Sequence, residues 1–189
     1  MSRALLAALV GGLILFVWGA VTHMVLPLGM VGMAPIPAEK DVAVIDLLKS
    51  AASENRIYTF PSWDPTSDAP WEQEPFKSRN ASGPTGLIVY SPGPGITNMA
   101  PSLVRELLTN VLQALAMALV VALLAPGVGY GGRVWVCTLI GIAGSLAIDA
   151  SYWIWYRFPG DFFVAQTAMN VLGALFAGLA IAKLATPRS

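Results

Sequence analysis

Four long apolar stretches constrain the fold of this chain more than any other feature of its sequence. They cover residues 4–26, 102–124, 134–156 and 162–184. A helix of about 20 apolar residues is long enough to cross the hydrocarbon core of a bilayer. The composition agrees, because only 12% of the residues are charged and 56% are hydrophobic, which is too apolar for an ordinary soluble domain. We therefore expect an all-α membrane bundle of four transmembrane helices.

The first apolar stretch has a second interpretation, as a cleaved signal peptide. Signal peptides have an apolar region of about 7–15 residues followed by a cleavage site of the A-x-A type. Here the apolar run continues past Trp18 to Pro27 without a clear site of that kind. We therefore predict that residues 1–26 form the first transmembrane helix and that residues 102–189 hold the other three.

Residues 27–101 differ in kind from the apolar stretches and are predicted to form a separate extracytoplasmic domain. They hold most of the charged residues and contain no run that could cross a membrane. Val42, Ile45 and Leu48 have the spacing of one helical face, which predicts a helix over residues 38–53. The chain would thus carry a small α+β insertion between its first two transmembrane helices.

The rest of this insertion is predicted to contain a pair of strands. Residues 57–60 and 87–90 are short β-prone runs bounded by Pro and Gly, a pattern typical of paired strands. The segment 61–84 between them is rich in Pro, Ser and Asp and is predicted to be a loop. Three aromatic residues indicate that part of this loop packs against other residues: Trp63, Trp71 and Phe76.

The orientation follows from the Lys and Arg residues in short loops, which stay on the cytoplasmic side. With the N-terminus inside, the inner segments carry Arg3, Arg133, Lys183 and Arg188, and the short outer connector carries Arg157 alone. Both termini are therefore expected in the cytoplasm. The compact chain and its lack of a disulfide framework favour a bacterial inner (plasma) membrane, which would place the insertion in the periplasm.

Each apolar stretch carries a helical face of small and polar residues, which is how membrane helices pack on one another. The ionisable and amide side chains lie nearer the outer end of each helix, so we expect them to meet in the outer half of the bilayer. An ionisable residue within a membrane span is a functional-site hypothesis by default. The predicted intramembrane cluster consists of His23, Glu106, Asn110, Gln113, Asp149, Tyr152, Gln166 and Asn170.

This cluster has three interpretations. The favoured one is a hydrogen-bonded network that fixes the register of the helices. A pocket for a quinone, a lipid or a haem edge is the second. A metal or proton-transfer site built from His23, Glu106 and Asp149 is the third, although these residues come from three helices and share no local spacing. His23, Met30 and Met33 are separate, weak candidates for a Cu(I) site, because thioethers suit that ion.

The sequence favours a non-catalytic protein. A single histidine and a single cysteine exclude the motifs of zinc proteases and of dithiol enzymes. The net charge of zero gives no reason to expect nucleic acid. We predict an accessory or assembly subunit of a larger membrane complex, with the lipid bilayer and other membrane subunits as partners and the extracytoplasmic domain as docking surface. The alternative is a small redox or ligand-binding membrane protein that holds a quinone, haem or metal in the outer polar pocket.

Overall fold

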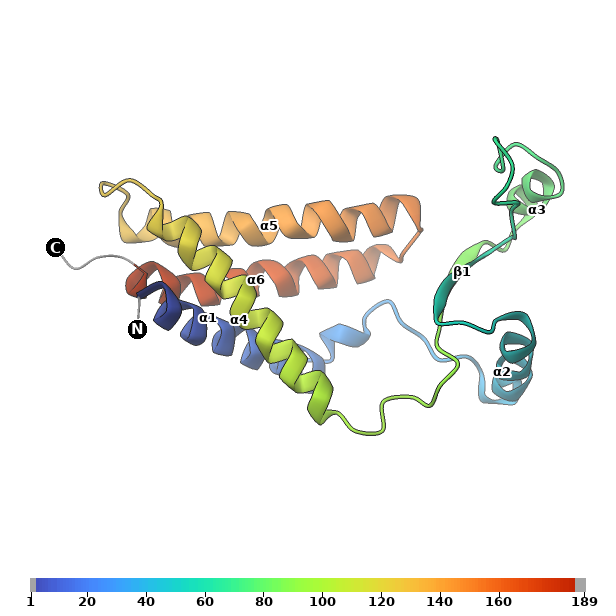
Figure 1. Cartoon of the computed structure of the whole chain (residues 1–189), viewed down its shortest axis with the longest axis horizontal. Helices are drawn as coiled ribbons and strands as arrows, with labels where there is room; N and C mark the ends of the chain where they lie inside the picture. The colour runs from blue at the N-terminus through green and yellow to red at the C-terminus, as the bar shows by residue number, and fades with distance from the viewer. Residues whose placement is uncertain (1–2, 186–189) are drawn as a thin grey trace. The chain divides into compact units, whose positions relative to one another are not determined.

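The computed structural model of the chain describes residues 3–185, which form mainly helices and one two-stranded sheet (Figure 1). These residues divide into two compact units. The helical unit consists of the segments that precede Pro35 and follow Thr97, and the inserted unit is Pro35–Thr97.

The helical unit confirms the four predicted apolar helices, each long and apolar enough to cross a membrane. They are α1 (Arg3–Ala20), α4 (Ala100–Ala122), α5 (Tyr130–Trp155) and α6 (Gly160–Leu184). A π-helical turn, Val21–Val25, extends α1, and a short 3-10 turn, Leu28–Met30, follows it.

Three of these helices begin a few residues before the predicted spans. Pro101 lies in the first turn of α4 and Pro159 directly precedes α6, positions where a missing amide hydrogen costs no helical hydrogen bond. α5 begins at Tyr130, ahead of two glycines that hydropathy alone assigned to the preceding loop. The apolar runs thus locate the helices, whereas the Pro and Gly residues at their starts decide where they begin.

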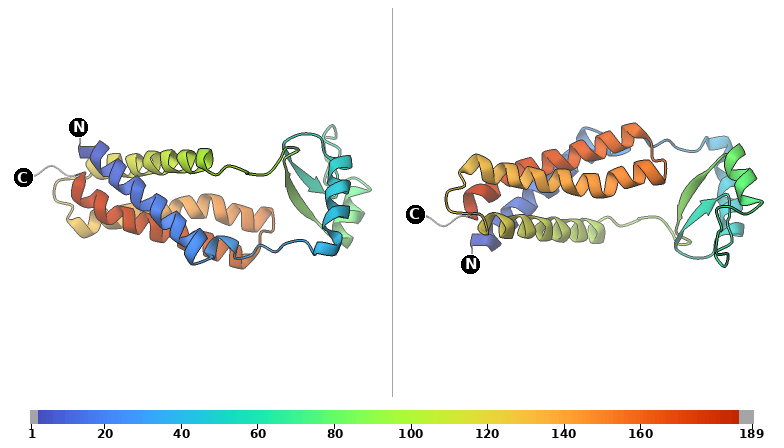
Figure 2. Two further views of the ribbon diagram at one scale, coloured as in Figure 1. Left: turned by 90° about the horizontal axis from the view of Figure 1, so that it is seen from below. Right: turned by 90° about the horizontal axis from the view of Figure 1, so that it is seen from above.

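The helices pack through small side chains. α1 packs against both α4 and α6, and α5 packs against α6 (Figure 2). A Cβ atom at Gly12 would lie 2.6 Å from the Cα of Val111, and one at Gly141 would lie 2.6 Å from the Cβ of Ala174. Such close approach of backbones is the usual basis of helix association where no hydrophobic effect drives it. The fully buried side chains at the centre include Met117 and Ile181.

The inserted unit contains two helices and a hairpin-like pair of strands. They are α2 (Ala38–Ala51), β1 (Arg56–Phe60), α3 (Phe76–Ser82) and β2 (Gly86–Tyr90). The strands are antiparallel, with Arg56 opposite Tyr90 and Phe60 opposite Gly86, which confirms the predicted pairing. The ring of Phe60 covers Gly86, where a Cβ would lie 2.6 Å from its Cζ.

One prediction for this unit was wrong. The segment 61–84 is not a continuous loop, because it contains the helix α3. Phe76 begins this helix, and its ring contacts Trp71 with the ring centroids 5.5 Å apart. The carboxylate of Glu74 accepts a hydrogen bond from the Ser78 amide at 3.2 Å. Local capping and an aromatic contact therefore stabilise a helix too short to show an apolar period.

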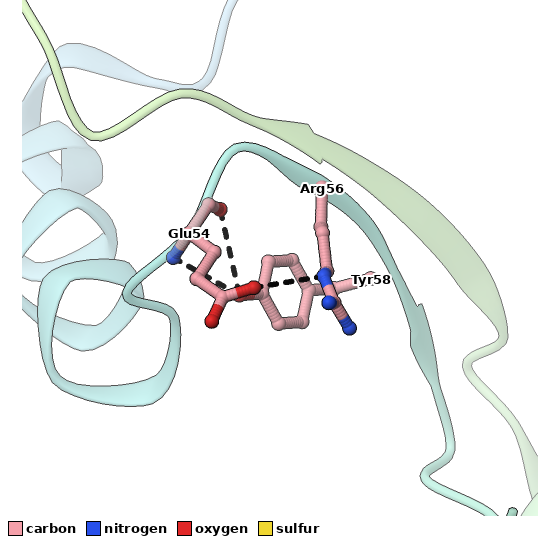
Figure 3. A network of polar contacts seen from close by, with 3 residues as sticks. All are labelled: Glu54, Arg56 and Tyr58. Atoms are coloured by element: carbon pink, nitrogen blue, oxygen red, sulfur yellow. Dashed lines mark hydrogen bonds and ion pairs between the residues drawn. The ribbon is translucent and has the colours of Figure 1, made fainter.

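A small polar network joins the end of α2 to β1 (Figure 3). The Nε of Arg56 lies 2.9 Å from a carboxylate oxygen of Glu54, and both side chains are largely exposed. The Tyr58 hydroxyl accepts a hydrogen bond from the Glu54 amide at 3.3 Å and donates one to the Glu54 carbonyl at 3.5 Å. An exposed ion pair of this kind contributes little to stability, so the network mainly fixes the turn that enters the strand.

Candidate functional site

A polar cavity lies at the end of the helical unit where α1 ends and where α4 and α6 begin. It has a volume of about 120 Å³ and is lined by residues of α1, its π turn, α4 and α6. Six of the eight residues of the predicted cluster line it: His23, Glu106, Asn110, Gln113, Gln166 and Asn170. We call this cavity the polar groove. The helical faces therefore do bring these side chains together.

The α1 side of the groove is organised by the backbone carbonyl of Gly19. The Thr22 hydroxyl donates a hydrogen bond to the Gly19 carbonyl at 3.0 Å, and the Nδ1 of His23 lies 2.9 Å from the same oxygen. Because a carbonyl only accepts, this contact is a hydrogen bond in the tautomer that carries the proton on Nδ1. The imidazole also packs against Gly29, which has no side chain to displace it. His23 is thus held by its own segment of chain.

Within the polar cluster, Asn170 makes the side-chain to side-chain hydrogen bonds between helices. Its amide nitrogen donates to the Ser145 hydroxyl and to a carboxylate oxygen of Asp149, both at 3.1 Å. These two bonds join α6 to α5. On α4, the Asn110 amide donates to the Glu106 carboxylate at 3.3 Å within one helix. Among residues 3–185, the side-chain hydrogen bonds of the cluster therefore join α5 to α6, and none of them joins α4 to another helix.

Two predicted residues lie outside the groove lining. Asp149 reaches it only through its hydrogen bond to Asn170. Tyr152 belongs to an aromatic group at the end of α5, where its ring stacks on Phe158 with centroids 5.3 Å apart and contacts Tyr156 at 5.8 Å. The turn after α5 thus draws Tyr152 away from the polar cluster.

The acids of the cluster do not assemble into a metal site. Within residues 3–185, no group of three His, Cys, Asp or Glu side chains could hold a metal ion. Glu106 and Asp149 come from α4 and α5, two helices with few mutual contacts. Met30 and Met33 are exposed, and the proposed Cu(I) site at these residues stays a prediction.

The structure also has an apolar hollow that the sequence did not reveal. Its volume is about 380 Å³, and it is lined by Leu13, Ile14, Val17, Trp18, Val21 and Phe176. The Trp18 indole donates to the Met169 carbonyl at 2.9 Å, so its polar atom is already satisfied. Phe176 meets Trp18 edge to face at 4.9 Å. Apolar residues are ordinary in such helices, so no sequence signal marked this surface.

The inserted unit leaves several large apolar side chains exposed. Ala52 is the one hydrophobic residue of Pro35–Thr97 that is buried, and α2 buries none of its residues. Several large apolar side chains are instead mostly exposed: Val42, Leu47, Trp71, Ile57 and Val89. Ile57 and Val89 lie directly opposite each other on the two strands, so they form one continuous patch on the sheet.

Comparison with protein-family models finds no matching family, and comparisons with curated proteins and with solved structures find no significant match.

Proposed function

We propose that this chain is a non-catalytic integral membrane protein, an accessory or assembly subunit of a larger complex. In this proposal the inserted unit is the docking surface. The observation that carries it is the near absence of a core in Pro35–Thr97, where Ala52 alone among the hydrophobic residues is buried. Large apolar patches on a protein surface usually mark sites of contact with other proteins.

The energetics support docking by this unit. A domain of about 60 residues is marginally stable even with an ordinary core. Each large apolar side chain that passes from water into a contact contributes roughly 1.5–3 kcal/mol. Val42, Leu47, Ile57 and Val89 are between 64% and 74% exposed, so a partner that covers them supplies the burial that the unit lacks.

The membrane setting is part of the proposal. Four helices of sufficient length and apolarity support a multi-pass protein. The Lys and Arg residues of its short connecting segments support cytoplasmic termini, with the inserted unit on the opposite side of a bacterial inner membrane. The polar groove then serves as a register device, because its cross-helix bonds from Asn170 join α5 and α6.

The competing function is the binding of a quinone, haem or metal in the polar groove. Pockets for small molecules usually measure about 300–1,000 Å³, and the groove measures about 120 Å³. This size favours the structural role. An absorption spectrum, metal analysis and lipid extract of the purified protein decide between the two. A bound group that disappears in Asp149→Ala or His23→Ala would support the ligand-binding function, whereas a lowered melting temperature alone would support the structural one.

Blue-native electrophoresis after mild detergent extraction tests the proposed function. We expect the chain to migrate in a complex with other polypeptides. Leu47→Asn should shift it to a smaller species, because Leu47 is 65% exposed on α2 and would lose an apolar contact. Asp46→Asn, at the adjacent exposed position, is the matched control and should leave the complex intact. Migration of the wild-type chain only as a monomer or homodimer would contradict the proposal.

A further inference from the structure

One face of α4 is polar and exposed over most of its length. Arg105, Glu106, Thr109 and Gln113 are all exposed. The buried residues of α4 are Ala114, Met117, Ala118 and Val121, and α4 packs mainly against α1. Glu106 and Gln113 also line the polar groove, so they lie on the flank of the polar face that is nearer to the other helices. We call the first surface the α4 polar face. In a helix proposed to cross a membrane, this face exposes two charges, those of Arg105 and Glu106.

The two charges of this face are uncompensated within residues 3–185. Arg105 has no ion pair there, and the Glu106 carboxylate has the Asn110 amide as its hydrogen-bond partner. Adjacent residues on a helix point about 100° apart, so Arg105 and Glu106 do not pair with each other. Membrane proteins generally pair such charges, and a second copy of the chain can supply both partners.

The positions of the two charges are self-complementary. Ser102, Thr109 and Ala116 recur every seven residues and define a line along α4. On a helical wheel, Arg105 lies on one side of this line and Glu106 lies on the other. The two residues differ in depth by about 1.5 Å. A helix that meets a parallel copy of itself along this line therefore brings opposite charges to the same level.

We propose that two copies of this chain pair through the α4 polar face, about a two-fold axis along the membrane normal. Such an axis places each residue of one copy at the same depth as its equivalent in the other copy. It also brings the Arg105 side of the contact line on one helix against the Glu106 side of that line on the other helix. Arg105 of each copy thus meets Glu106 of the other, in two reciprocal pairs. Thr109 and Ala116 lie at the centre, where small side chains let the two backbones approach closely.

This pairing goes beyond the proposed function, since a dimer can exist alone or within a larger complex. It uses residues of the helical unit, whereas the proposed accessory role uses residues of the inserted unit. Electrophoresis that reveals no larger complex would remove the accessory role and would leave the dimer standing. Failure of the cross-linking described below would remove the dimer and would leave the accessory role standing.

Cysteine cross-linking in intact membranes tests the dimer. Oxidation of Thr109→Cys should produce a disulfide-linked dimer of the chain. Leu108→Cys, at an exposed position about 100° away on the same helix, is the matched control and should not. The unmodified chain is the second control, because its single cysteine, Cys137, is buried. Equal cross-linking at positions 108 and 109, no cross-linking at 109, or a product at 109 that contains another polypeptide would each overturn the proposal.

Charge exchange tests the pairing itself. In the Thr109→Cys background, Arg105→Glu should reduce the dimer yield several-fold, because it places like charges together, and Glu106→Arg should do the same. The double variant Arg105→Glu/Glu106→Arg restores opposite charges and should restore the yield. Recovery in the double variant also shows that neither new side chain is by itself incompatible with the fold. A double variant that cross-links no better than the single ones would contradict the reciprocal pairs.

Discussion

Within the described residues, Asn170 makes the side-chain to side-chain hydrogen bonds that join two helices of the bundle. Its amide donates to Ser145 and to Asp149 on α5. Asn170→Ala should therefore lower the stability of the detergent-solubilised protein by roughly 1 kcal/mol, the usual scale for a hydrogen bond between membrane helices. Gln166→Ala is the control in the same groove, because Gln166 makes no side-chain hydrogen bond to the part of the chain that is described. Thermal unfolding measures both, and equal losses would contradict a linking role.

Asp64 gives the inserted unit a local pH dependence. The Thr66 hydroxyl and amide both donate to its Oδ1, at 2.7 and 2.9 Å, and these bonds lower the pKa of the carboxyl below its ordinary value. Because the folded pKa is the lower one, the turn is fully stabilised above the ordinary Asp pKa. That stabilisation is lost as the pH falls through the folded value.

An NMR titration of the Asp64 carboxyl carbon in the full-length protein checks this dependence. We expect a midpoint below that of an aspartate in an unstructured peptide. Thr66→Val removes the hydroxyl donor and keeps the amide, so it should raise the pKa of Asp64 part of the way back. A midpoint unchanged by the substitution would show that the hydroxyl is not the cause.

At the scale of elements, the packing of α5 depends on which of its glycines faces a neighbour. A Cβ at Gly141 would lie 2.6 Å from the Cβ of Ala174, whereas one at Gly144 would have no atom within 4 Å. Gly141→Ala should destabilise the bundle by about 1–3 kcal/mol through overpacking. Gly144→Ala should be neutral or stabilising, since alanine favours a helix by about 1 kcal/mol over glycine. Melting temperatures in one detergent compare the two, and equal effects would contradict the packing of α5 on α6.

The long helices were predictable because apolar length is a signal that each stretch carries by itself. The seven residues of α3 were not, since they follow Pro75 and owe their shape to a cap from Glu74 and a ring contact with Trp71. Helical wheels also found the polar faces of α4 and α6. They did not show that Tyr152 turns toward Phe158, because that depends on the loop after α5.

At the scale of the whole molecule, the sequence could not predict which helices contact one another. Every apolar helix has small residues on a face, so the pattern alone does not show that α1 contacts both α4 and α6 while α5 contacts α6. The polar groove exists because α4 makes few contacts with α5 and α6. The sequence also did not predict that so few side chains of the inserted unit are buried. Its helix and strands have the apolar spacing of ordinary buried elements, but few other residues of the unit cover them.

Limited proteolysis of the inserted unit tests most directly whether it is a docking surface. All its Lys and Arg residues are potential trypsin sites: Lys40, Lys49, Arg56, Lys77 and Arg79. We predict rapid cleavage in the purified chain, because so little of this unit is buried, and slow cleavage in opened native membranes, where a partner covers it. Native membranes in which strong detergent has dissociated the complexes are the control and should regain rapid cleavage. Equal rates in the purified chain and in native membranes would contradict the account.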